Sequence, residues 1–296
     1  MSRTSTCQWV KATAVVYKNR AVVGRATFGV IHKMTLNAGK RDWSESIQVT
    51  KANITGDAHG IKMSLAAKPD GISPSSTSTT KVTRNKFPQG HTIGGSSFTG
   101  SISYHDSVGK KKFERSLVTY TYIFTKTGRD VDDAQINSAH YRCDDMFWEG
   151  PGQRRHTKAP GCAFYGFPSK VSFKGLTNIA NGIKALRHRG GHYGDPGAGS
   201  RSRALHMTWD QKRIKDNRNK VCPSSRHAPA DMKRKGRTSC DEYPMAATYE
   251  GGTYLPASQR ETTWATPTEQ NKQGSRMSAF RKTYRVLDRD AFYVTV

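Results

Sequence analysis

The sequence contains no apolar run of about 18 residues or more, which is the length that a membrane-spanning helix requires. Residues 1–9 include no continuous hydrophobic segment and no small-residue cleavage site, so they lack the pattern of a secretory signal peptide. We therefore expect no membrane span. The chain is expected to be either cytosolic or a mature form whose leader has been removed.

Acidic residues are scarce in this chain. The 23 Asp and Glu residues stand against 48 Lys and Arg residues, which leaves a formal net charge of +25. A charge of this size indicates an anionic partner such as nucleic acid, an anionic membrane or an acidic polymer; the alternative is a basic surface without a specific partner. The 11 Phe, 12 Tyr and 5 Trp residues argue against wholesale disorder, and a length of 296 residues suggests about two domains.

Cysteine is also rare, and the five cysteines include no Cys-x-x-Cys pair and no zinc-like spacing with histidine. The simplest pairing joins Cys143 to Cys162 and Cys222 to Cys240 through two short loops, although four cysteines allow other connectivities. Two disulfides would place the protein in an oxidising compartment. Cys7 is left over, either free or paired to something outside this chain.

The first half of the chain has a β pattern. Residues 10–125 alternate between apolar and polar side chains, and turn-forming residues separate the alternating segments. Residues 73–80 form a low-complexity loop of Ser, Thr and Pro. This pattern predicts an antiparallel β-sandwich of immunoglobulin-like size over residues 1–135. Because we find no catalytic constellation there, and isolated histidines such as His32 are more often core or surface residues than ligands, we expect an accessory scaffold or binding domain.

The composition changes near Cys143, and residues 140–296 are expected to form a second domain that makes the whole chain α+β. Apolar residues at helical spacing predict a helix over residues 176–188, and a second, polar helix is predicted over residues 208–220. Residues 153–158 are expected to form a basic loop closed by the first disulfide. His188 and His192 have the spacing of a helical metal site, but the glycines between them break the helix that such a site needs.

Two adjacent carboxylates, Asp241 and Glu242, lie on a short segment that is restrained on both sides. Cys240 can fix one end covalently, and Pro244 restricts the backbone just after the pair. Residues 233–237 directly upstream are almost all cationic. A protein that only bound phosphate would gain nothing from carboxylates at this point, because they repel the ligand, so the arrangement favours a proton acceptor or a metal site. The alternative is that both carboxylates form ordinary ion pairs with neighbouring Lys and Arg side chains.

Residues 240–252 have the sequence Cys-Asp-Glu-Tyr-Pro-Met-Ala-Ala-Thr-Tyr-Glu-Gly-Gly. This segment resembles the signature of the NucA/NucB family of secreted bacterial deoxyribonucleases, in which an Asp-Glu-aromatic-Pro core precedes small residues and Glu-Gly-Gly. Residues 269–274 and 286–294 resemble the family's closing segment, although many relatives have Gly where this chain has Arg289. The resemblance covers roughly residues 140–296, most strongly from Cys222 onward, and the paired cysteines are similar to those of longer actinobacterial members.

The resemblance implies a ββα-metal nuclease domain with disulfides, in which one general base and one metal ion hydrolyse a phosphodiester. Asp241 would be the general base, with Glu242 and Glu250 as supporting catalytic residues. Asn271, ahead of an expected helix over residues 275–284, and Gln273 would hold Mg²⁺ or Mn²⁺ through amide oxygens. Phosphate contacts are expected from five cationic residues: Lys235, Arg237, Arg276, Arg281 and Lys282.

The sequence therefore predicts a secreted, metal-dependent endodeoxyribonuclease that acts on DNA with little sequence preference and has an N-terminal β-sandwich. The expected partners are DNA and, for a toxin role, an immunity or inhibitor protein. One alternative is a non-catalytic protein that binds extracellular DNA or another polyanion. A second alternative is a nuclease toxin effector that uses the first half of the chain for delivery.

Overall fold

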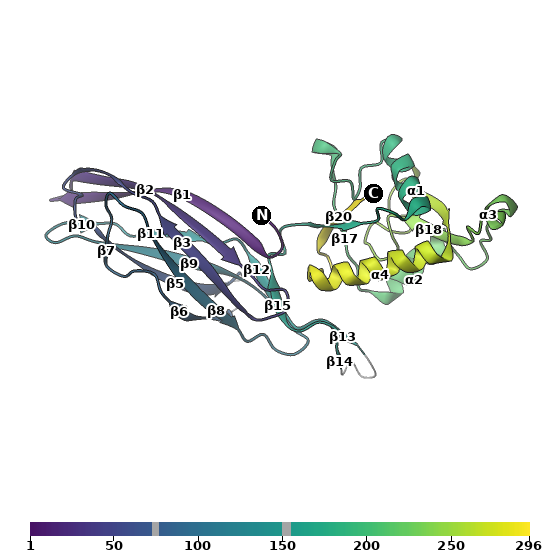
Figure 1. Ribbon diagram of the computed structural model, residues 1–296, viewed down its shortest axis with the longest axis horizontal. Coiled ribbons are helices and arrows are strands. Elements are labelled where there is room, and N and C mark those ends of the chain that lie inside the picture. The colour runs from purple at the N-terminus through teal and green to yellow at the C-terminus, as the bar shows by residue number, and fades with distance from the viewer. Residues whose placement is uncertain (73–76, 150–154) are drawn as a thin grey trace. The chain divides into compact units, whose positions relative to one another are not determined.

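The computed structural model describes residues 1–72, 77–149 and 155–296, and the chain forms two compact units, Met1–Phe164 and Tyr165–Val296. Strands predominate in the first unit, whereas the four described α-helices all belong to the second (Figure 1). The expected mixture of α and β structure is confirmed. No helix within the described ranges is both long enough and apolar enough to span a membrane.

The first unit contains two antiparallel sheets. One sheet has the strand order β10-β1-β2-β3-β8-β6 with β4 paired to β2, and the other has the order β15-β12-β9-β5-β7 with β11 paired to β9. The first sheet consists of β1 (Ser5–Lys18), β2 (Ala21–Thr35), β3 (Asp42–Val49), β4 (Asn53–Gly56), β6 (Thr80–Asn85), β8 (Phe98–Asp106) and β10 (Asp130–Val131). The second consists of β5 (Lys62–Gly71), β7 (His91–Thr92), β9 (Phe113–Thr125), β11 (Ala134–Asn137), β12 (Tyr141–Asp144) and β15 (Gly161–Ala163).

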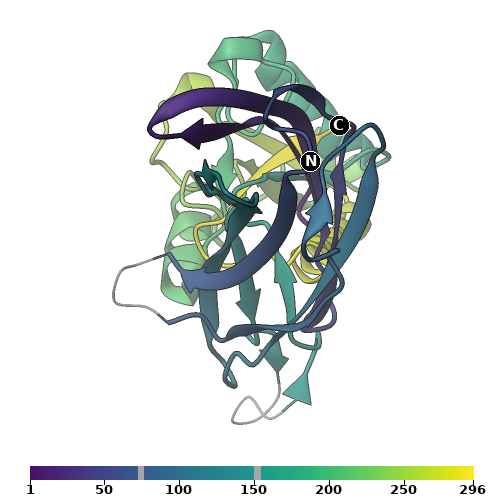
Figure 2. The same ribbon diagram turned by 90° about the vertical axis from the view of Figure 1, so that its left-hand side faces the viewer.

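The two sheets pack face to face through their apolar sides. Alternate residues of β3 are buried, as the period of two predicts for a strand with one covered face. Phe28 of the first sheet contacts Phe124 of the second with ring centroids 6.0 Å apart, and Trp43 meets Tyr141 at 5.4 Å. Figure 2 views this unit end on and shows its strands in two curved layers, as in a β-sandwich.

A buried polar cluster lies between these sheets. Glu45 accepts hydrogen bonds from the hydroxyls of Tyr104 at 2.8 Å and Tyr120 at 2.7 Å, and it also contacts Nδ1 of His32. The other ring nitrogen of His32 contacts the hydroxyl of Tyr122. Because buried polar groups are costly without partners, the mutual contacts explain how a carboxylate can remain in this core. His32 is therefore a core histidine.

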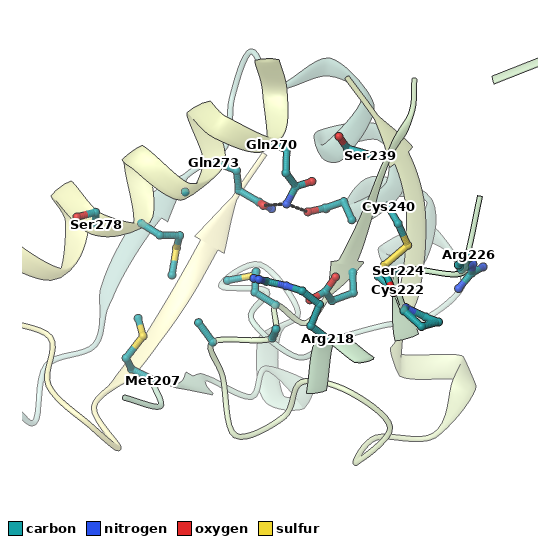
Figure 3. A pocket seen from close by; sticks show the side chains of 18 of the residues that line it. Met207, Arg218, Cys222, Ser224, Arg226, Ser239, Cys240, Gln270, Gln273 and Ser278 are labelled. Atoms are coloured by element: carbon teal, nitrogen blue, oxygen red, sulfur yellow. Dashed lines mark hydrogen bonds between the residues drawn. A yellow bond between two sulfur atoms is a disulfide. The ribbon is translucent and has the colours of Figure 1, made fainter. Parts of the chain in front are cut away.

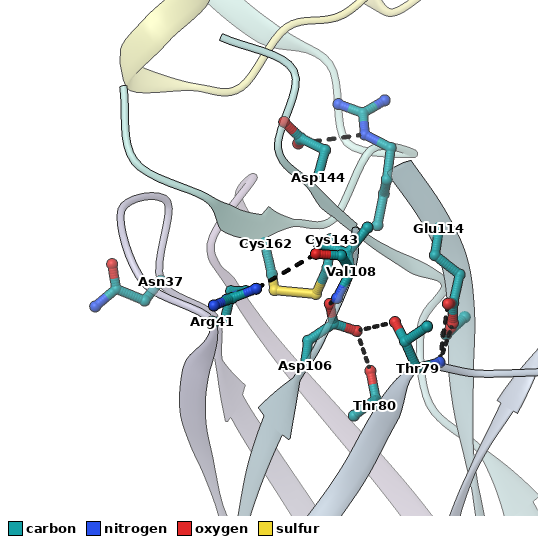
Figure 4. The surroundings of a disulfide bond; sticks show 12 residues. Asn37, Arg41, Thr79, Thr80, Asp106, Val108, Glu114, Cys143, Asp144 and Cys162 are labelled. Atoms are coloured by element: carbon teal, nitrogen blue, oxygen red, sulfur yellow. Dashed lines mark hydrogen bonds and ion pairs between the residues drawn. A yellow bond between two sulfur atoms is a disulfide. The ribbon is translucent and has the colours of Figure 1, made fainter. Parts of the chain in front are cut away.

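The first unit extends beyond the boundary that the sequence predicted between residues 135 and 140. Strand β12 pairs with β9 and with β15, and the Cys143–Cys162 disulfide joins β12 to β15. Figure 4 shows this bridge beside Asp106, which accepts hydrogen bonds from the hydroxyls of Thr79 and Thr80 at 2.9 Å each. The first predicted disulfide is thus present, and it stabilises the β-sheet unit.

Two predicted loops of the first unit are described only in part. Residues 73–76 of the low-complexity loop lie outside the described residues, and Thr80, its last residue, already begins β6. Residues 153 and 154 of the basic loop also lie outside the described residues. The next two residues form β14 (Arg155–His156), which pairs with β13 (Trp148–Glu149) in a two-stranded ribbon.

The second unit combines short strands with four helices. Its three-stranded sheet has β20 (Ala291–Thr295) in the centre, parallel to β16 (Ser169–Ser172) and antiparallel to β17 (Leu205–His206). A separate antiparallel ribbon pairs β18 (Ser239–Tyr243) with β19 (Glu261–Ala265). The helices are α1 (Thr177–His188), α2 (Gln211–Val221), α3 (Ala230–Arg234) and α4 (Pro267–Thr283), and short 3₁₀ turns occur at Gly199–Arg201 and Ala257–Gln259.

The helix predicted over residues 176–188 is confirmed as α1. Its buried residues Ile179, Ala180, Ile183 and Leu186 recur at helical spacing and join the core of this unit. The core also contains Phe173, Leu205, Met245, Phe280 and Phe292. The α1 side of this core meets the β18–β19 ribbon, which explains why the ribbon has a defined position although it has only two strands.

The two later helices differ from their predicted bounds. Helix α2 begins at Gln211, three residues after the predicted start at 208, because Asp210 caps it by accepting hydrogen bonds from the backbone N–H groups of Lys212 and Arg213. Helix α4 begins at Pro267, so its predicted start at residue 275 was wrong. Thr266 and Glu269 form a capping box at this end, with Pro267 in the first turn. The sequence signal for this earlier start was present in Thr266, Pro267 and Glu269.

Candidate active site

A cavity of about 610 Å³ lies in the second unit between β18, α4 and the C-terminal part of α2. Its lining includes Asp241, Glu242, Gln270, Gln273, Arg218 and Arg281. Figure 3 shows Gln270 and Gln273 projecting from one helix toward the strand that carries Cys240, with Arg218 on the other side of the cavity. Three segments that are distant in the sequence thus enclose one polar space.

The Cys222–Cys240 disulfide connects the end of α2 to β18 directly before Asp241. This second predicted disulfide is therefore also present. Because the bridge fixes the residue next to Asp241, it restrains the strand on which both acidic residues lie. The Tyr243–Pro244 peptide bond that follows is cis.

Helix α2 is held against the loop after β18 by the buried side chain of Asn217. Its Nδ2 atom donates hydrogen bonds to the backbone oxygens of Ala246 at 2.9 Å and Thr248 at 3.1 Å. The two glycines of the motif complete this contact: a Cβ atom at Gly251 would lie 2.5 Å from the oxygen of Met245, and Gly252 has a φ of +68° beside Asn217. The Glu-Gly-Gly segment is thus explained by close packing against α2.

Asp241 and Glu242 are both nearly inaccessible to solvent, at 4% and 7% exposure. Burial, together with the negative charge of Glu242, raises the pKa of Asp241 from 3.8 to about 7, and the Gln270 and Gln273 side chains partly offset this rise. Burial also raises the pKa of Glu242, while the positive charge of Arg218 acts in the opposite direction. Asp241 can therefore exchange a proton near neutral pH, as a general base must.

Gln270 and Gln273 lie one helical turn apart on the face of α4 that lines the cavity. The Nε2 atom of Gln270 donates to Oδ1 of Asp241 and to Oε1 of Gln273, each at 3.2 Å. Within the described part of the chain, Oε1 of Gln270 is buried without a hydrogen-bond partner. A buried acceptor beside a carboxylate is costly unless something is bound to it, so the site has an unused oxygen ligand.

The remaining predicted catalytic and metal residues lie elsewhere. Glu250 is outside the cavity, where its carboxylate accepts hydrogen bonds from the backbone N–H of His206 at 2.9 Å and pairs with its ring at 2.7 Å. Asn271 is exposed on α4, away from the cavity-lining face that carries its neighbours Gln270 and Gln273. The expectation that Asn271 precedes a helix was wrong, because the residue lies inside α4.

The predicted phosphate-binding cations are also divided by the structure. Arg281 lines the cavity, whereas Lys235 is exposed at the C-terminal end of α3 and Lys282 lies partly buried at the end of α4. Arg276 donates to the backbone oxygens of Ser172 at 3.1 Å and Lys174 at 2.7 Å, and Arg237 donates to the oxygen of Trp264. The side chains of Arg276 and Arg237 therefore bind the backbone of their own unit.

Sequence reasoning did not single out Gln270 or Arg218, both of which line the cavity. Gln270 could have been found, because it precedes Gln273 by one helical turn and would share its face in a helix that began at Pro267. Arg218 was one of several cations in the polar helix over 208–220, and no pattern in that segment distinguishes the one that enters the cavity.

The residues of the cavity suit a hard divalent cation, although the donors are not a dense acidic cluster. Within residues 1–72, 77–149 and 155–296, no group of three or more His, Cys, Asp or Glu side chains is placed to hold a metal ion. The cavity nevertheless combines two carboxylates with two amides, and Oε1 of Gln270 is unpartnered. Mg²⁺ prefers oxygen ligands, keeps several waters and often takes only one or two carboxylates, so these residues fit such an ion.

Residues 197–295 match the family model described as Deoxyribonuclease NucA/NucB. The C-terminal half of the chain resembles this family. No curated protein matches the chain. The NucA/NucB match contains β17, α2, β18, β19 and α4, and so it includes every residue of the cavity. It supports a deoxyribonuclease, and DNA as the substrate, for the second unit.

Proposed function

We propose that the second unit is a metal-dependent endodeoxyribonuclease that hydrolyses phosphodiester bonds of DNA, with Asp241 as the general base. The observation that carries this proposal is the pairing of buried Asp241 with Gln270 in a cavity that lies within the NucA/NucB match. Asp241 is buried and hydrogen-bonded, and its pKa is raised to about 7. Such surroundings tune a carboxylate for base catalysis.

The order of elements supports a ββα-metal type of site. Strands β18 and β19 form an antiparallel ribbon, and α4 follows β19 after Thr266 alone. Asp241 lies on the first strand of this ribbon, and α4 supplies Gln270 and Gln273 to the same cavity. The resemblance implies a ββα-metal site, and in this chain the ribbon would supply the base while α4 supplies the metal ligands.

In the proposed reaction, Asp241 accepts a proton from a water molecule while the oxygen of that water bonds to phosphorus. The bond from phosphorus to the leaving oxygen then breaks, that oxygen takes a proton from solvent, and Asp241 returns its proton to solvent. Gln270 orients the Asp241 carboxylate through its hydrogen bond. The amide oxygens of Gln270 and Gln273 would hold Mg²⁺ or Mn²⁺, with Glu242 in the same cavity. When bound, the ion supplies positive charge that stabilises the phosphate during attack.

Cations at the cavity are suited to the DNA backbone. Arg218 and Arg281 line the cavity and place positive charge beside the proposed phosphate position. The net charge of +25 favours contacts with many phosphates, which bind DNA without distinguishing its bases. We therefore propose little sequence preference. The two disulfides support a secreted protein, because such bonds persist in oxidising compartments.

We further propose that the first unit is an accessory domain. It lies outside the NucA/NucB match, and its buried carboxylate Glu45 is bound by two tyrosine hydroxyls and His32 within the core. These contacts stabilise the two sheets and leave the carboxylate inaccessible to a substrate.

Plasmid digestion at low salt tests the enzymatic proposal. The full chain is incubated with Mg²⁺, Mn²⁺ or EDTA beside the variants Asp241→Asn and Asp231→Asn. Asp231 is the matched control, because it is an aspartate of the same unit on α3, outside the cavity. We expect nicking and linearisation that require a metal, persist in Asp231→Asn and fall by about 100-fold or more in Asp241→Asn.

Two other outcomes would change the conclusion. Tight, salt-sensitive DNA binding without cleavage in any metal would favour a non-catalytic DNA-binding protein. Cleavage that survives Asp241→Asn at the wild-type rate would exclude Asp241 as the base while leaving the nuclease activity in place.

A further inference from the structure

Two groups of aromatic rings and cations, linked through Asp288, extend from the active-site cavity along the second unit. We call them together the cation–aromatic strip, which consists of Arg281, Trp209, Arg289, Tyr249, Arg213, Tyr254 and Lys220. The strip begins in the cavity, because Arg281 lines the cavity and its guanidinium lies 4.6 Å from the ring centroid of Trp209.

The outer part of the strip is formed by α2 and the segment after β18. The guanidinium of Arg213 lies between two rings, 4.7 Å from Tyr249 and 5.2 Å from Tyr254. The ammonium of Lys220 lies 5.1 Å from the ring of Tyr254. Arg213 and Lys220 are two helical turns apart, so they project from the same side of α2.

The inner part of the strip is held together by one carboxylate. Asp288 accepts hydrogen bonds from the backbone N–H of Trp209 at 2.9 Å and from the hydroxyl of Tyr249 at 3.0 Å. Arg289 places its guanidinium 5.7 Å from the ring of Tyr249 and lies close to the Asp288 carboxylate, with 3.8 Å between Nε and Oδ2. The negative charge of Asp288 is thus offset locally, and the Tyr249 hydroxyl is tied to the backbone of Trp209 through one carboxylate.

The outer part of the strip is open to solvent, whereas Trp209 packs partly buried against the core of the unit. Tyr254 is 57% exposed, and the side chain of Arg289 is 79% exposed. Aromatic rings that alternate with cations along an open surface are characteristic of proteins that bind single-stranded nucleic acid, in which bases stack on the rings while Lys and Arg contact the phosphates. The alternative is that the cations only cover the apolar rings, a role that needs no ligand.

We propose that the cation–aromatic strip binds an unpaired segment of DNA adjacent to the cleavage site, with a base stacked on Tyr254 and phosphates near Arg213 and Lys220. This inference rests on the proposed nuclease function for the location of the cleavage site. The occupant is a single strand because the bases of a duplex are already stacked on each other and cannot cover an isolated ring. The strip would therefore increase the affinity of the protein for single-stranded DNA and for duplex ends and gaps. It would not increase the affinity for intact duplex.

The test measures binding of the full chain to a fluorescent single-stranded oligonucleotide and to the corresponding duplex, in EDTA so that no cleavage occurs. Tyr254→Ala is compared with Tyr254→Phe, which keeps the ring, and with Lys220→Ala. Lys184→Ala is the charge control, because Lys184 is an exposed lysine of α1 in the same unit. Thermal melting of each variant establishes that it is folded.

We expect Tyr254→Ala to weaken single-strand binding by about 5-fold or more while duplex binding changes little. Tyr254→Phe should bind as the wild type does, and Lys220→Ala should weaken binding more than Lys184→Ala. Wild-type single-strand affinity in Tyr254→Ala, or an equal loss on both DNAs, would overturn the proposal.

The same experiment separates this inference from the proposed nuclease function. If the wild type cleaves plasmid but Tyr254→Ala binds single strands normally, the strip proposal fails alone. If no metal supports cleavage yet Tyr254→Ala loses single-strand binding, the nuclease proposal fails, and the strip remains as a DNA-binding site.

Discussion

Gln270 donates a hydrogen bond from Nε2 to Oδ1 of Asp241 at 3.2 Å, and this contact joins α4 to β18 across the cavity. The contact requires Gln270 to lie within the helix, and it does so because the capping box of Thr266 and Glu269 starts α4 at Pro267. The environment of the proposed base is therefore determined partly by a helix cap four residues before Gln270. Asp241 and Gln270 are the first residues at which to test the site.

Replacement of Asp241 by Asn is expected to stabilise the metal-free protein in a pH-dependent way. The folded-state pKa of Asp241 is about 7, against an ordinary value of 3.8, so the folded protein binds this proton more tightly than the unfolded chain does. The contribution of Asp241 to the free energy of unfolding is then fully present below about pH 4 and is lost as the pH rises through about 7. This loss of stability approaches an upper limit of about 4 kcal/mol at higher pH. The variant Asp241→Asn does not suffer the loss, because Asn does not ionise.

Urea denaturation in EDTA at about pH 5 and about pH 8 measures this effect. The stabilisation of Asp241→Asn over wild type should be clearly larger at the higher pH, whereas Asp231→Asn should show no such trend. Equal effects of Asp241→Asn at both pH values would contradict the assigned environment of Asp241.

Replacement of Gln270 by Ala is expected to raise the pKa of Asp241 further. The hydrogen bond from Gln270 favours the ionised carboxylate and so lowers the pKa of Asp241. Without this hydrogen bond, burial and the charge of Glu242 raise that pKa further. An NMR titration of the carboxyl carbon of Asp241 in EDTA measures the change directly. Lys272→Ala, an exposed position of the same helix, is the control and should leave the titration unchanged. An unaltered or lowered pKa in Gln270→Ala would show that the hydrogen bond does not act on the ionised form.

Replacement of Asn217 by Ala is expected to destabilise the second unit by about 2–3 kcal/mol. The substitution removes the donor for two backbone oxygens, those of Ala246 and Thr248, and leaves both acceptors in a buried position. Chemical denaturation measures the loss, and Asn219→Ala on the exposed side of α2 should change stability by much less. Similar effects from the two substitutions would mean that Asn217 does not anchor the loop after β18.

The two disulfides are expected to have separable effects. Cys222→Ser combined with Cys240→Ser opens a loop with a sequence separation of 18, which should cost about 3 kcal/mol and lower nuclease activity, because Cys240 precedes Asp241. Cys143→Ser combined with Cys162→Ser opens a loop with a separation of 19 in the first unit and should leave the activity of the folded enzyme largely intact. Denaturation and plasmid digestion together distinguish the pairs. The reverse pattern of activity loss would contradict a catalytic site in the second unit.

Much of the architecture was predictable because its signals are local. The alternation in residues 10–125 indicated β-strands with one buried face, and the apolar spacing in residues 176–188 indicated α1. The two short cysteine spacings indicated the disulfides that the structure contains. Arg289, where the family resemblance leads us to expect Gly, lies in a turn and adopts a φ of 65°, a conformation that favours Gly.

The sequence by itself determined the Asp241–Glu242 pair, its cysteine bridge and the family that residues 197–295 resemble, because these features depend on residues that are neighbours or have fixed spacing. Only the tertiary structure decided that Gln270 and Arg218 line the cavity while Asn271 and Glu250 lie outside it. The physical reason is that adjacent residues of a helix point in directions about 100° apart. Which of residues 270–273 face Asp241 therefore depends on the rotation of α4 about its own axis, and only the packing of α4 against β18 selects that rotation.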